Sequence, residues 1–184
     1  SSARQNAVPH RQRERRRNGV KISVISFTKT GQQLAERIRE SMDGGDETII
    51  LYSKCSRKKT VQTAKNVTTQ TFGGIPNKDS NVPTDNTGDT IAVQESVSAW
   101  AGEQMAAHHA LVFIGACGIA VRAIAPWITD KLHDSPVLVA DEMGKYVIPL
   151  LSGHVGGANE LAVRLAGALG AIPVITTATD LHDS

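Results

Sequence analysis

An apolar run that leads through a glycine turn into an alanine-rich helix occurs twice after residue 109. "ALVFIGA" at 110–116 leads into "GIAVRAIAPW", and "YVIPLL" at 146–151 leads through "SGHVGG" into "ANELAVRLAGALG". Short unbroken runs of Val, Ile and Leu are typical of strands buried on both faces of a parallel sheet. The chain is therefore predicted to be an α/β protein with three layers, a mostly parallel open sheet carrying helices on both faces and one hairpin.

The remaining segments fit this sheet. "VKISVISF" is rich in β-branched residues, and "EMGK" at 142–145 is a short turn that makes 146–151 the hairpin partner of the strand before it. Strands are expected at 20–27, 48–53, 110–116, 135–141 and 146–151, and a final strand and loop at 171–180. Helices are expected at 32–40, within 91–109, at 118–127 and at 156–170. The first two strands and their helix form a βαβ unit, so these two strands should pair in parallel.

Two segments lack the pattern of a folded core. "RQRERRR" lies in residues 1–19, which are expected to form a basic disordered tail, and the polar stretch at about 54–90 is rich in Thr, Asn and Asp. We expect a single α/β domain at 20–184 that carries 54–90 as a flexible insertion. A chain of 184 residues is long enough for one domain with a buried core.

Composition excludes several classes of protein. Cys55 and Cys117 show no CxxC spacing, so neither a metal site nor a disulfide framework is expected. No run approaches about 18 apolar residues and the N-terminus lacks an apolar segment, so we expect a cytoplasmic protein without a membrane contact. The arginine cluster can bind RNA, but no aromatic residue interleaves it, and no nucleic-acid partner is expected. No feature of the sequence indicates an oligomeric state.

The first glycine turn joins strand and helix at Gly115, Ala116, Cys117 and Gly118. In open α/β sheets, ligands bind where strands end and helices begin, because the loops converge there and helix N-termini present free N–H groups. The glycines either bring the backbone close to an anion or only allow a tight turn. Arg122 either faces an acidic group or is an exposed helix residue. The missing GxGxxG and GK[ST] patterns argue against a nucleotide site, although a phosphate-binding domain stays an alternative.

The second turn holds His154 between Gly153 and the glycine pair 156–157. The histidine can be a general base, a ligand to a metal carried by the substrate, or a structural residue. Asn159 and Glu160 either cap the following helix or belong to a site, and the adjacent acids Asp141 and Glu142 are better explained as hairpin-turn residues than as an acid/base pair. Thr176, Thr177 and Asp180 end the last strand, either as a polar loop or on the ligand side of the sheet.

Three segments resemble a known family nearly end to end. "VFIGACGIAVRAIAPW", "DKLHDSPVLVADEMGKYVIPLLSGHVGGANELA" and "GALGAIPVITTATD" are similar to the N-terminal region of the cobalamin-biosynthesis protein G (CbiG) family, the cobalt-precorrin-5A hydrolases. The resemblance implies opening of the δ-lactone of cobalt-precorrin-5A with release of acetaldehyde, which gives cobalt-precorrin-5B in anaerobic cobalamin biosynthesis. Cys117 departs from the family, where threonine is expected.

The resemblance also implies a site and partners. Lactone hydrolysis needs a base and oxyanion donors, so His154 is assigned as the base and Glu160 as its orienting residue. The substrate-binding residues are predicted to be Gly115, Ala116, Cys117, Gly118, Arg122, Ser152, Gly153, Gly156, Gly157, Asn159, Thr176, Thr177 and Asp180. The tetrapyrrole substrate carries the cobalt, so no cofactor is expected, and contacts are expected with a C-terminal domain or other corrin-pathway enzymes. The alternative is a tetrapyrrole-binding domain without catalysis.

Overall fold

The computed structural model describes residues 19–55, 90–153 and 156–177. Its strands and helices follow one another in an α/β order: β1 Val20–Ser26, α2 Lys29–Met42, β2 Glu47–Ser53, β3 Ile91–Ala92, α3 Val97–Ala106, β4 Ala110–Ile114, α4 Cys117–Ile124, β5 Val137–Ala140, β6 Tyr146–Leu151, α5 Ala158–Leu169 and β7 Ile172–Pro173. A short 3-10 turn at Ala125–Trp127 contains Pro126 and ends the helical segment after α4. Most of the predicted tail and insertion lies outside the described residues, so the proposed domain limits stay predictions.

All seven described strands form one sheet in the order β3-β2-β1-β4-β5-β6-β7. The pairs from β3 to β5 are parallel, whereas β5 and β6 are antiparallel and β7 runs parallel to β6. The predicted mostly parallel open sheet with one hairpin is therefore confirmed. No helix within the described segments has the length and apolar character that a membrane span requires.

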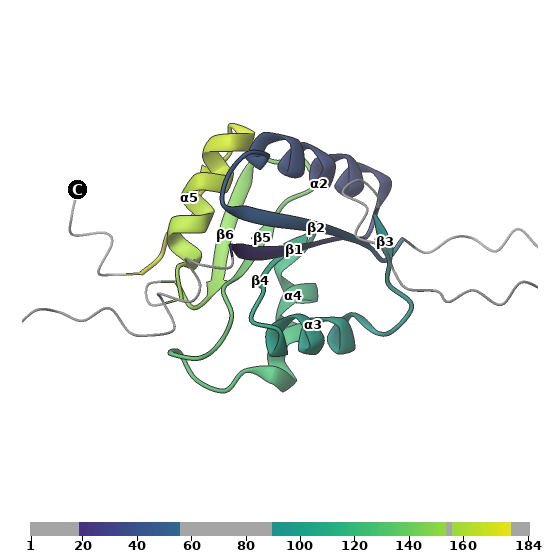
Figure 1. Ribbon diagram of the computed structural model, residues 1–184, viewed down its shortest axis with the longest axis vertical. Helices are drawn as coiled ribbons and strands as arrows, with labels where there is room; N and C mark the ends of the chain where they lie inside the picture. The colour runs from purple at the N-terminus through teal and green to yellow at the C-terminus, as the bar shows by residue number, and fades with distance from the viewer. Residues whose placement is uncertain (1–18, 56–89, 154–155, 178–184) are drawn as a thin grey trace, which may run out of the picture.

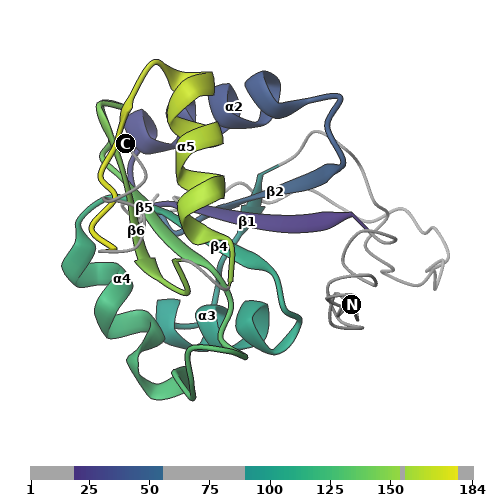
Figure 2. The same cartoon turned by 90° about the vertical axis from the view of Figure 1, so that its left-hand side faces the viewer.

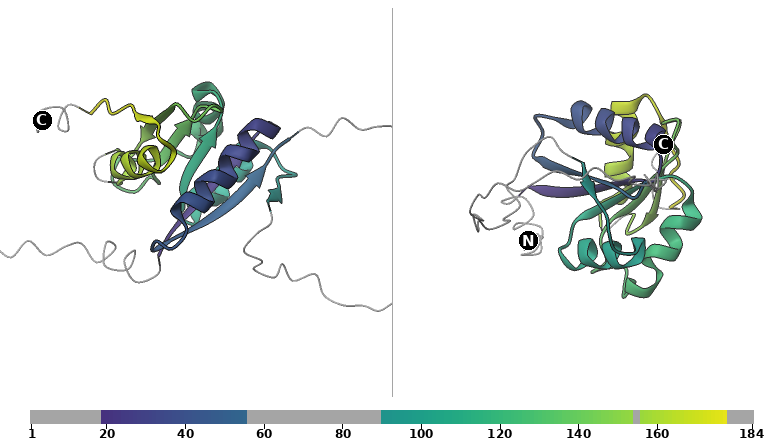
Figure 3. Two further views of the ribbon diagram at one scale, coloured as in Figure 1. Left: turned by 90° about the horizontal axis from the view of Figure 1, so that it is seen from above. Right: turned by 90° about the vertical axis from the view of Figure 1, so that its right-hand side faces the viewer.

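Helices cover both faces of the sheet, as predicted. Figures 1 and 2 show α2 and α5 on one face and α3 and α4 on the other, and the view from above in Figure 3 shows α2 and α5 over the same face. Side chains alternate along the central strand β4: Val112 and Ile114 enter the core under α2 and α5, while Leu111 and Phe113 enter the core under α3 and α4. The sheet therefore separates two apolar cores.

Two helices begin at different residues than the periodicity predicts. α2 starts at Lys29 instead of residue 32, because the Thr28 hydroxyl caps it by accepting from the Gly31 amide at 3.0 Å. The helix expected within 91–109 begins only at Val97, capped by Ser96. The residues that looked like the start of this helix instead form the edge strand β3. Val93 follows this strand, and its amide donates to the Ser53 carbonyl. The last strand is also shorter than expected and ends at Pro173.

A buried polar network lies under α3, within an otherwise apolar core. The Ser23 hydroxyl donates to Gln104 Oε1 at 2.7 Å, and His109 Nδ1 lies 3.0 Å from both of these side-chain atoms. Partial burial lowers the pKa of His109 below its ordinary value, and the charge of Lys21 adds to this decrease. The folded protein therefore favours the neutral imidazole.

His109 should make the folded state less stable in mild acid. Its pKa is lower in the folded than in the unfolded chain, so below about pH 6.5 the unfolded chain binds more protons, and the stability gained from a neutral His109 is lost as the pH falls. We expect the free energy of unfolding, measured with urea between pH 7.5 and 5, to fall less steeply in His109→Gln than in the parent chain. Equal slopes in the two proteins would contradict this assignment.

Candidate functional site

The two glycine turns lie at opposite ends of the sheet. The Gly115 amide donates to the carbonyl of Ala140, the last residue of β5, at 2.9 Å. Ser152 follows β6, which runs antiparallel to β5, and its hydroxyl donates to the Asp134 carbonyl ahead of β5 at 3.0 Å. The expectation that the two turns converge is therefore wrong, because the hairpin reverses the direction of β6 before the second turn begins.

The first turn lies at the carboxyl end of the parallel strands. β1 leads into α2 on one face and the neighbouring β4 leads into α4 on the other, and such a change of direction is the usual ligand position in an open α/β sheet. Gly115 has a φ of +154° that favours glycine, and a Cβ built there would lie 3.5 Å from the Phe27 ring. The ends of β1 and β4 are therefore in contact at this edge.

The structure brings Gly115, Ala116, Cys117, Gly118 and Arg122 together at this carboxyl edge. Ala116 caps α4 without a side-chain hydrogen bond, so no side chain of the described residues occupies the first amides of the helix as a cap. The guanidinium of Arg122 donates to the Gly118 carbonyl at 3.2 Å and lies, exposed, against the same turn. Backbone amides and a cation in this arrangement suit a carboxylate.

Thr28 and Glu142 join two loops at the carboxyl edge, and sequence reasoning missed this pair. The Thr28 hydroxyl donates to Glu142 Oε1 at 2.7 Å while it accepts from the Gly31 amide. The two residues are 114 positions apart, so no local pattern signals the contact. The neighbouring Asp141 accepts from the amides of Met143, Lys145 and Tyr146, which confirms it as a hairpin-turn residue.

Thr28→Ala should destabilise the carboxyl edge by about 1 kcal/mol, because it removes the cap of α2. It also releases the Glu142 carboxylate, but that contact is exposed and contributes little. The free energy of unfolding in urea measures the loss. Thr28→Ser keeps the hydroxyl, so its free energy of unfolding should lie within a few tenths of a kcal/mol of that of the parent chain. An equal loss of stability in both variants would contradict the capping role.

The second turn, at the amino end of β5, is closed by its own backbone. The amides of Ala158 and Asn159 donate to the carbonyls of Ser152 and Gly153 at 3.1 and 3.0 Å. The first two amides of α5 are therefore already occupied, unlike the anion-binding arrangement expected from the sequence. Ser152 has a φ of +58°, which is uncommon for a residue other than glycine. Such a backbone is frequent at functional sites.

Several predicted site residues lie around this turn, and others do not. The Asn159 amide group donates to the Thr177 hydroxyl at 2.7 Å, so the last described residue of the chain reaches the start of α5. Glu160 and Thr176 are exposed, and the Glu160 side chain makes no hydrogen bond within the described segments. His154 and Asp180 lie outside the described residues, so their assigned roles stay predictions.

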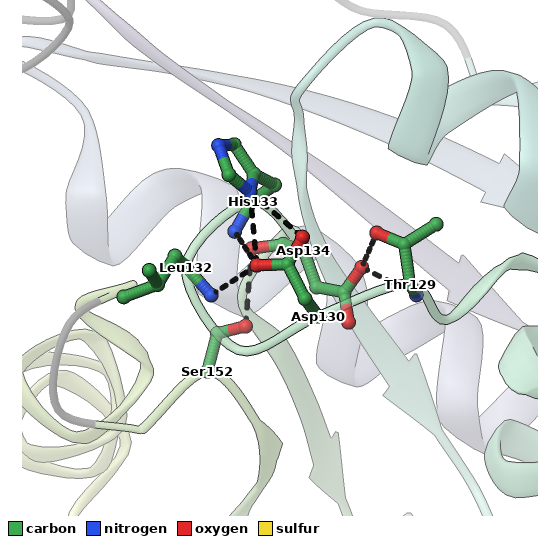
Figure 4. Close-up of polar contacts among 6 residues, drawn as sticks. All are labelled: Thr129, Asp130, Leu132, His133, Asp134 and Ser152. Carbon is green, nitrogen blue, oxygen red and sulfur yellow. Dashed lines mark hydrogen bonds and ion pairs between the residues drawn. The ribbon is translucent and has the colours of Figure 1, made fainter.

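A polar loop at 128–135 borders the second turn and was also missed (Figure 4). Asp134 is only 6% exposed; its Oδ1 accepts from the amide and the hydroxyl of Thr129, at 2.9 and 2.8 Å. Asp130 accepts from the His133 ring, and this bond, with the Leu132 amide, holds the pKa of Asp130 below its usual value. The Asp-x-x-His spacing was the available signal for this pair.

The chain is similar to proteins of cobalamin synthesis. Residues 99–180 match the family described as "Cobalamin synthesis G N-terminal". Cobalt-precorrin-5A hydrolase from Salmonella typhimurium is 64% identical over 74 residues, which is 40% of this chain and 21% of that protein. The enzyme of the same name from Priestia megaterium is 53% identical over 72 residues, 39% of this chain and 19% of that enzyme. The chain thus spans about a fifth of these relatives' length.

A solved structure supports the fold over more of the chain. The crystal structure of a putative cobalamin biosynthesis protein G homolog from Sulfolobus solfataricus aligns with a TM-score of 0.54 at 20% identity, over 86% of this chain and 37% of that chain. The family match begins at residue 99, within α3. The described sheet nevertheless joins β1 directly to β4, so the segment before the match contributes strands to the same fold.

Proposed function

We propose that this chain, whose residues 99–180 match the cobalamin synthesis G N-terminal family, works as part of a cobalt-precorrin-5A hydrolase. The observation that carries the proposal is the 64% identity to the Salmonella typhimurium enzyme of that name over 74 residues. The proposed reaction opens the δ-lactone of cobalt-precorrin-5A and releases acetaldehyde, which leaves cobalt-precorrin-5B. The cobalt belongs to the tetrapyrrole substrate, and no further cofactor is proposed.

We assign the chemistry to the turn at the amino end of β5. His154 is the proposed base that activates water, and Glu160 is the proposed orienting residue. The closeness of Ser152, Asn159 and Thr177 to this turn supports their assignment to substrate binding, as does the unusual backbone at Ser152. Gly153, Gly156, Gly157, Thr176 and Asp180 complete the proposed set at this end.

The carboxyl edge is the second proposed binding end. The backbone amides of Ala116, Cys117 and Gly118 and the guanidinium of Arg122 suit a peripheral carboxylate of the substrate. The Gly115 amide donates to the Ala140 carbonyl, so Gly115 belongs to the proposed set through the shape of its backbone at the turn. The proposed partners are other corrin-pathway enzymes and the region of the longer relatives that this chain does not span. A domain that binds the tetrapyrrole without turning it over is the alternative, and one experiment separates the two functions.

The test grafts this chain in place of the N-terminal region of the Salmonella typhimurium relative and measures acetaldehyde release from cobalt-precorrin-5A under anaerobic conditions. We expect the graft to retain activity, and its His154→Ala variant to be slower by roughly 10²- to 10⁴-fold, the usual contribution of a general base. Full release by His154→Ala would remove the base assignment. Tight substrate binding by the graft without release would favour the binding-domain alternative.

A further inference from the structure

The strongest unused feature of the molecule is the histidine–carboxylate pair in the loop at 128–135. His133 Nδ1 lies 2.9 and 2.7 Å from the two carboxylate oxygens of Asp130. The carboxylate is itself held in place, because its Oδ1 also accepts from the amides of Leu132 and His133 at 2.8 and 3.1 Å. The loop therefore fixes Asp130 first, and Asp130 fixes the imidazole ring (Figure 4).

This contact decides which ring nitrogen has a free lone pair. A carboxylate accepts hydrogen bonds, so the neutral imidazole carries its proton on Nδ1 and leaves Nε2 as the acceptor. Histidines that ligate metals commonly donate their other N–H to a carboxylate, which sets the ring orientation and raises the basicity of the ligating nitrogen. The pair has the geometry of a prepared metal ligand.

The surroundings of the pair do not fit a free metal ion. A structural or catalytic zinc site needs at least three protein ligands, and the described segments contain no group of three His, Cys, Asp or Glu side chains that could hold a metal ion. The side chains of His133 and Asp130 are 59% and 48% exposed, so the imidazole ring is open to solvent. A single open nitrogen suits a metal whose equatorial positions are already filled by a macrocycle.

The residues around His133 fit a flat, apolar and negatively charged ligand. Leu132 and Ile128 expose large apolar side chains in the same loop, and Lys131 between them is exposed and cationic. The loop also borders the proposed substrate turn, since the Asp134 carbonyl accepts from the Ser152 hydroxyl at 3.0 Å. Apolar contacts next to a ligating nitrogen are what a tetrapyrrole face requires.

We propose that His133 Nε2, oriented by Asp130, is an axial ligand to the cobalt of the tetrapyrrole substrate. The nitrogen lone pair replaces an axial water on the metal, so no oxidant or other reactant is needed. The inference rests on the proposed function for the identity of the ligand. It assigns to His133 a role in positioning the substrate, separate from the base role of His154.

The test uses Co(II)-cobyrinic acid, a corrinoid with carboxylate side chains and no axial nitrogen base of its own, mixed with the 184-residue chain. Equilibrium dialysis measures binding, and electron paramagnetic resonance of the bound fraction detects nitrogen on the cobalt. We expect triplet splitting from an axial nitrogen, which becomes a doublet when histidine is labelled with ¹⁵N. His133→Gln should lose the splitting, Asp130→Asn should bind roughly 10- to 100-fold more weakly, and His108→Gln, an exposed histidine on another segment, should match the parent chain.

Absence of binding, binding without nitrogen splitting, or splitting that survives in His133→Gln would each overturn the inference. These outcomes are separable from a failure of the proposed function, because acetaldehyde release by the graft is measured independently. A graft that releases acetaldehyde at the parent rate with His133→Gln keeps the hydrolase proposal and removes the axial ligand. Circular dichroism checks that the exposed loop substitution leaves the fold intact.

Discussion

Phe113→Ala is expected to lower the free energy of unfolding by about 3 to 5 kcal/mol, the usual cost of deleting a large aromatic side chain from a core. Phe113 is fully buried in β4, on the sheet face that α3 and α4 cover. Its ring packs edge-on against Trp100 with the centroids 5.6 Å apart, and Trp100 packs in the same way against Tyr52 at 5.3 Å. The substitution therefore removes one end of a row of three rings that meet edge to face, with Trp100 at its centre.

The loss is a large fraction of the stability of a domain, which is commonly 5 to 15 kcal/mol. Urea unfolding followed by circular dichroism measures it, and the tryptophan fluorescence of the folded protein should also change because Trp100 loses its neighbour. Val163→Ala, at a position of α5 that is 52% exposed, is the matched control and should change the free energy by about 0.5 kcal/mol or less. A Phe113→Ala protein as stable as this control would contradict the described core.

The fold could be predicted from the sequence because its strongest signals are local. β4 and β5 are short apolar runs buried along their whole length, and each is bounded by a turn. The glycine turn at Gly144 correctly predicted the hairpin of β5 and β6. The helix boundary at Val97 was missed because Val93 lies four residues before it, which is a helical spacing. Val93 is instead buried because it follows an edge strand, and spacing alone does not distinguish burial on a helix face from burial beside a strand.

The candidate site was predicted less well, because it depends on where the ends of strands lie in space. The hairpin already implied that β6 runs antiparallel to β5, and this direction carries Ser152 to the opposite end of the sheet from Gly115. The contact of Thr28 with Glu142 joins distant segments and has no sequence signal. The Asp130 and His133 pair is local, and its spacing was a signal that sequence reasoning overlooked.

Among substitutions in the second turn, Gly156→Ala should lower the free energy of unfolding the most. A Cβ at this position would lie 2.3 Å from Ser152 Cβ and 2.7 Å from the Ser152 carbonyl oxygen, so backbone must move. That carbonyl also accepts from the Ala158 amide at the start of α5, and the displacement breaks this hydrogen bond. Overpacking costs about 1 to 3 kcal/mol and the lost bond about 1 more, so the free energy of unfolding should fall by roughly 3 kcal/mol.

In the hydrolase graft, Gly156→Ala should slow acetaldehyde release by about 100-fold, since a displacement near 1 Å has this effect on a positioned catalytic group. Gly167→Ala, in the helix that follows this turn, is the matched control: Gly167 is exposed, no atom lies within 4 Å of its added Cβ, and alanine there should stabilise α5 by about 0.5 to 1 kcal/mol. If Gly156→Ala lowers stability but leaves release at the parent rate, the turn only closes α5, and the chemistry must lie elsewhere in the protein.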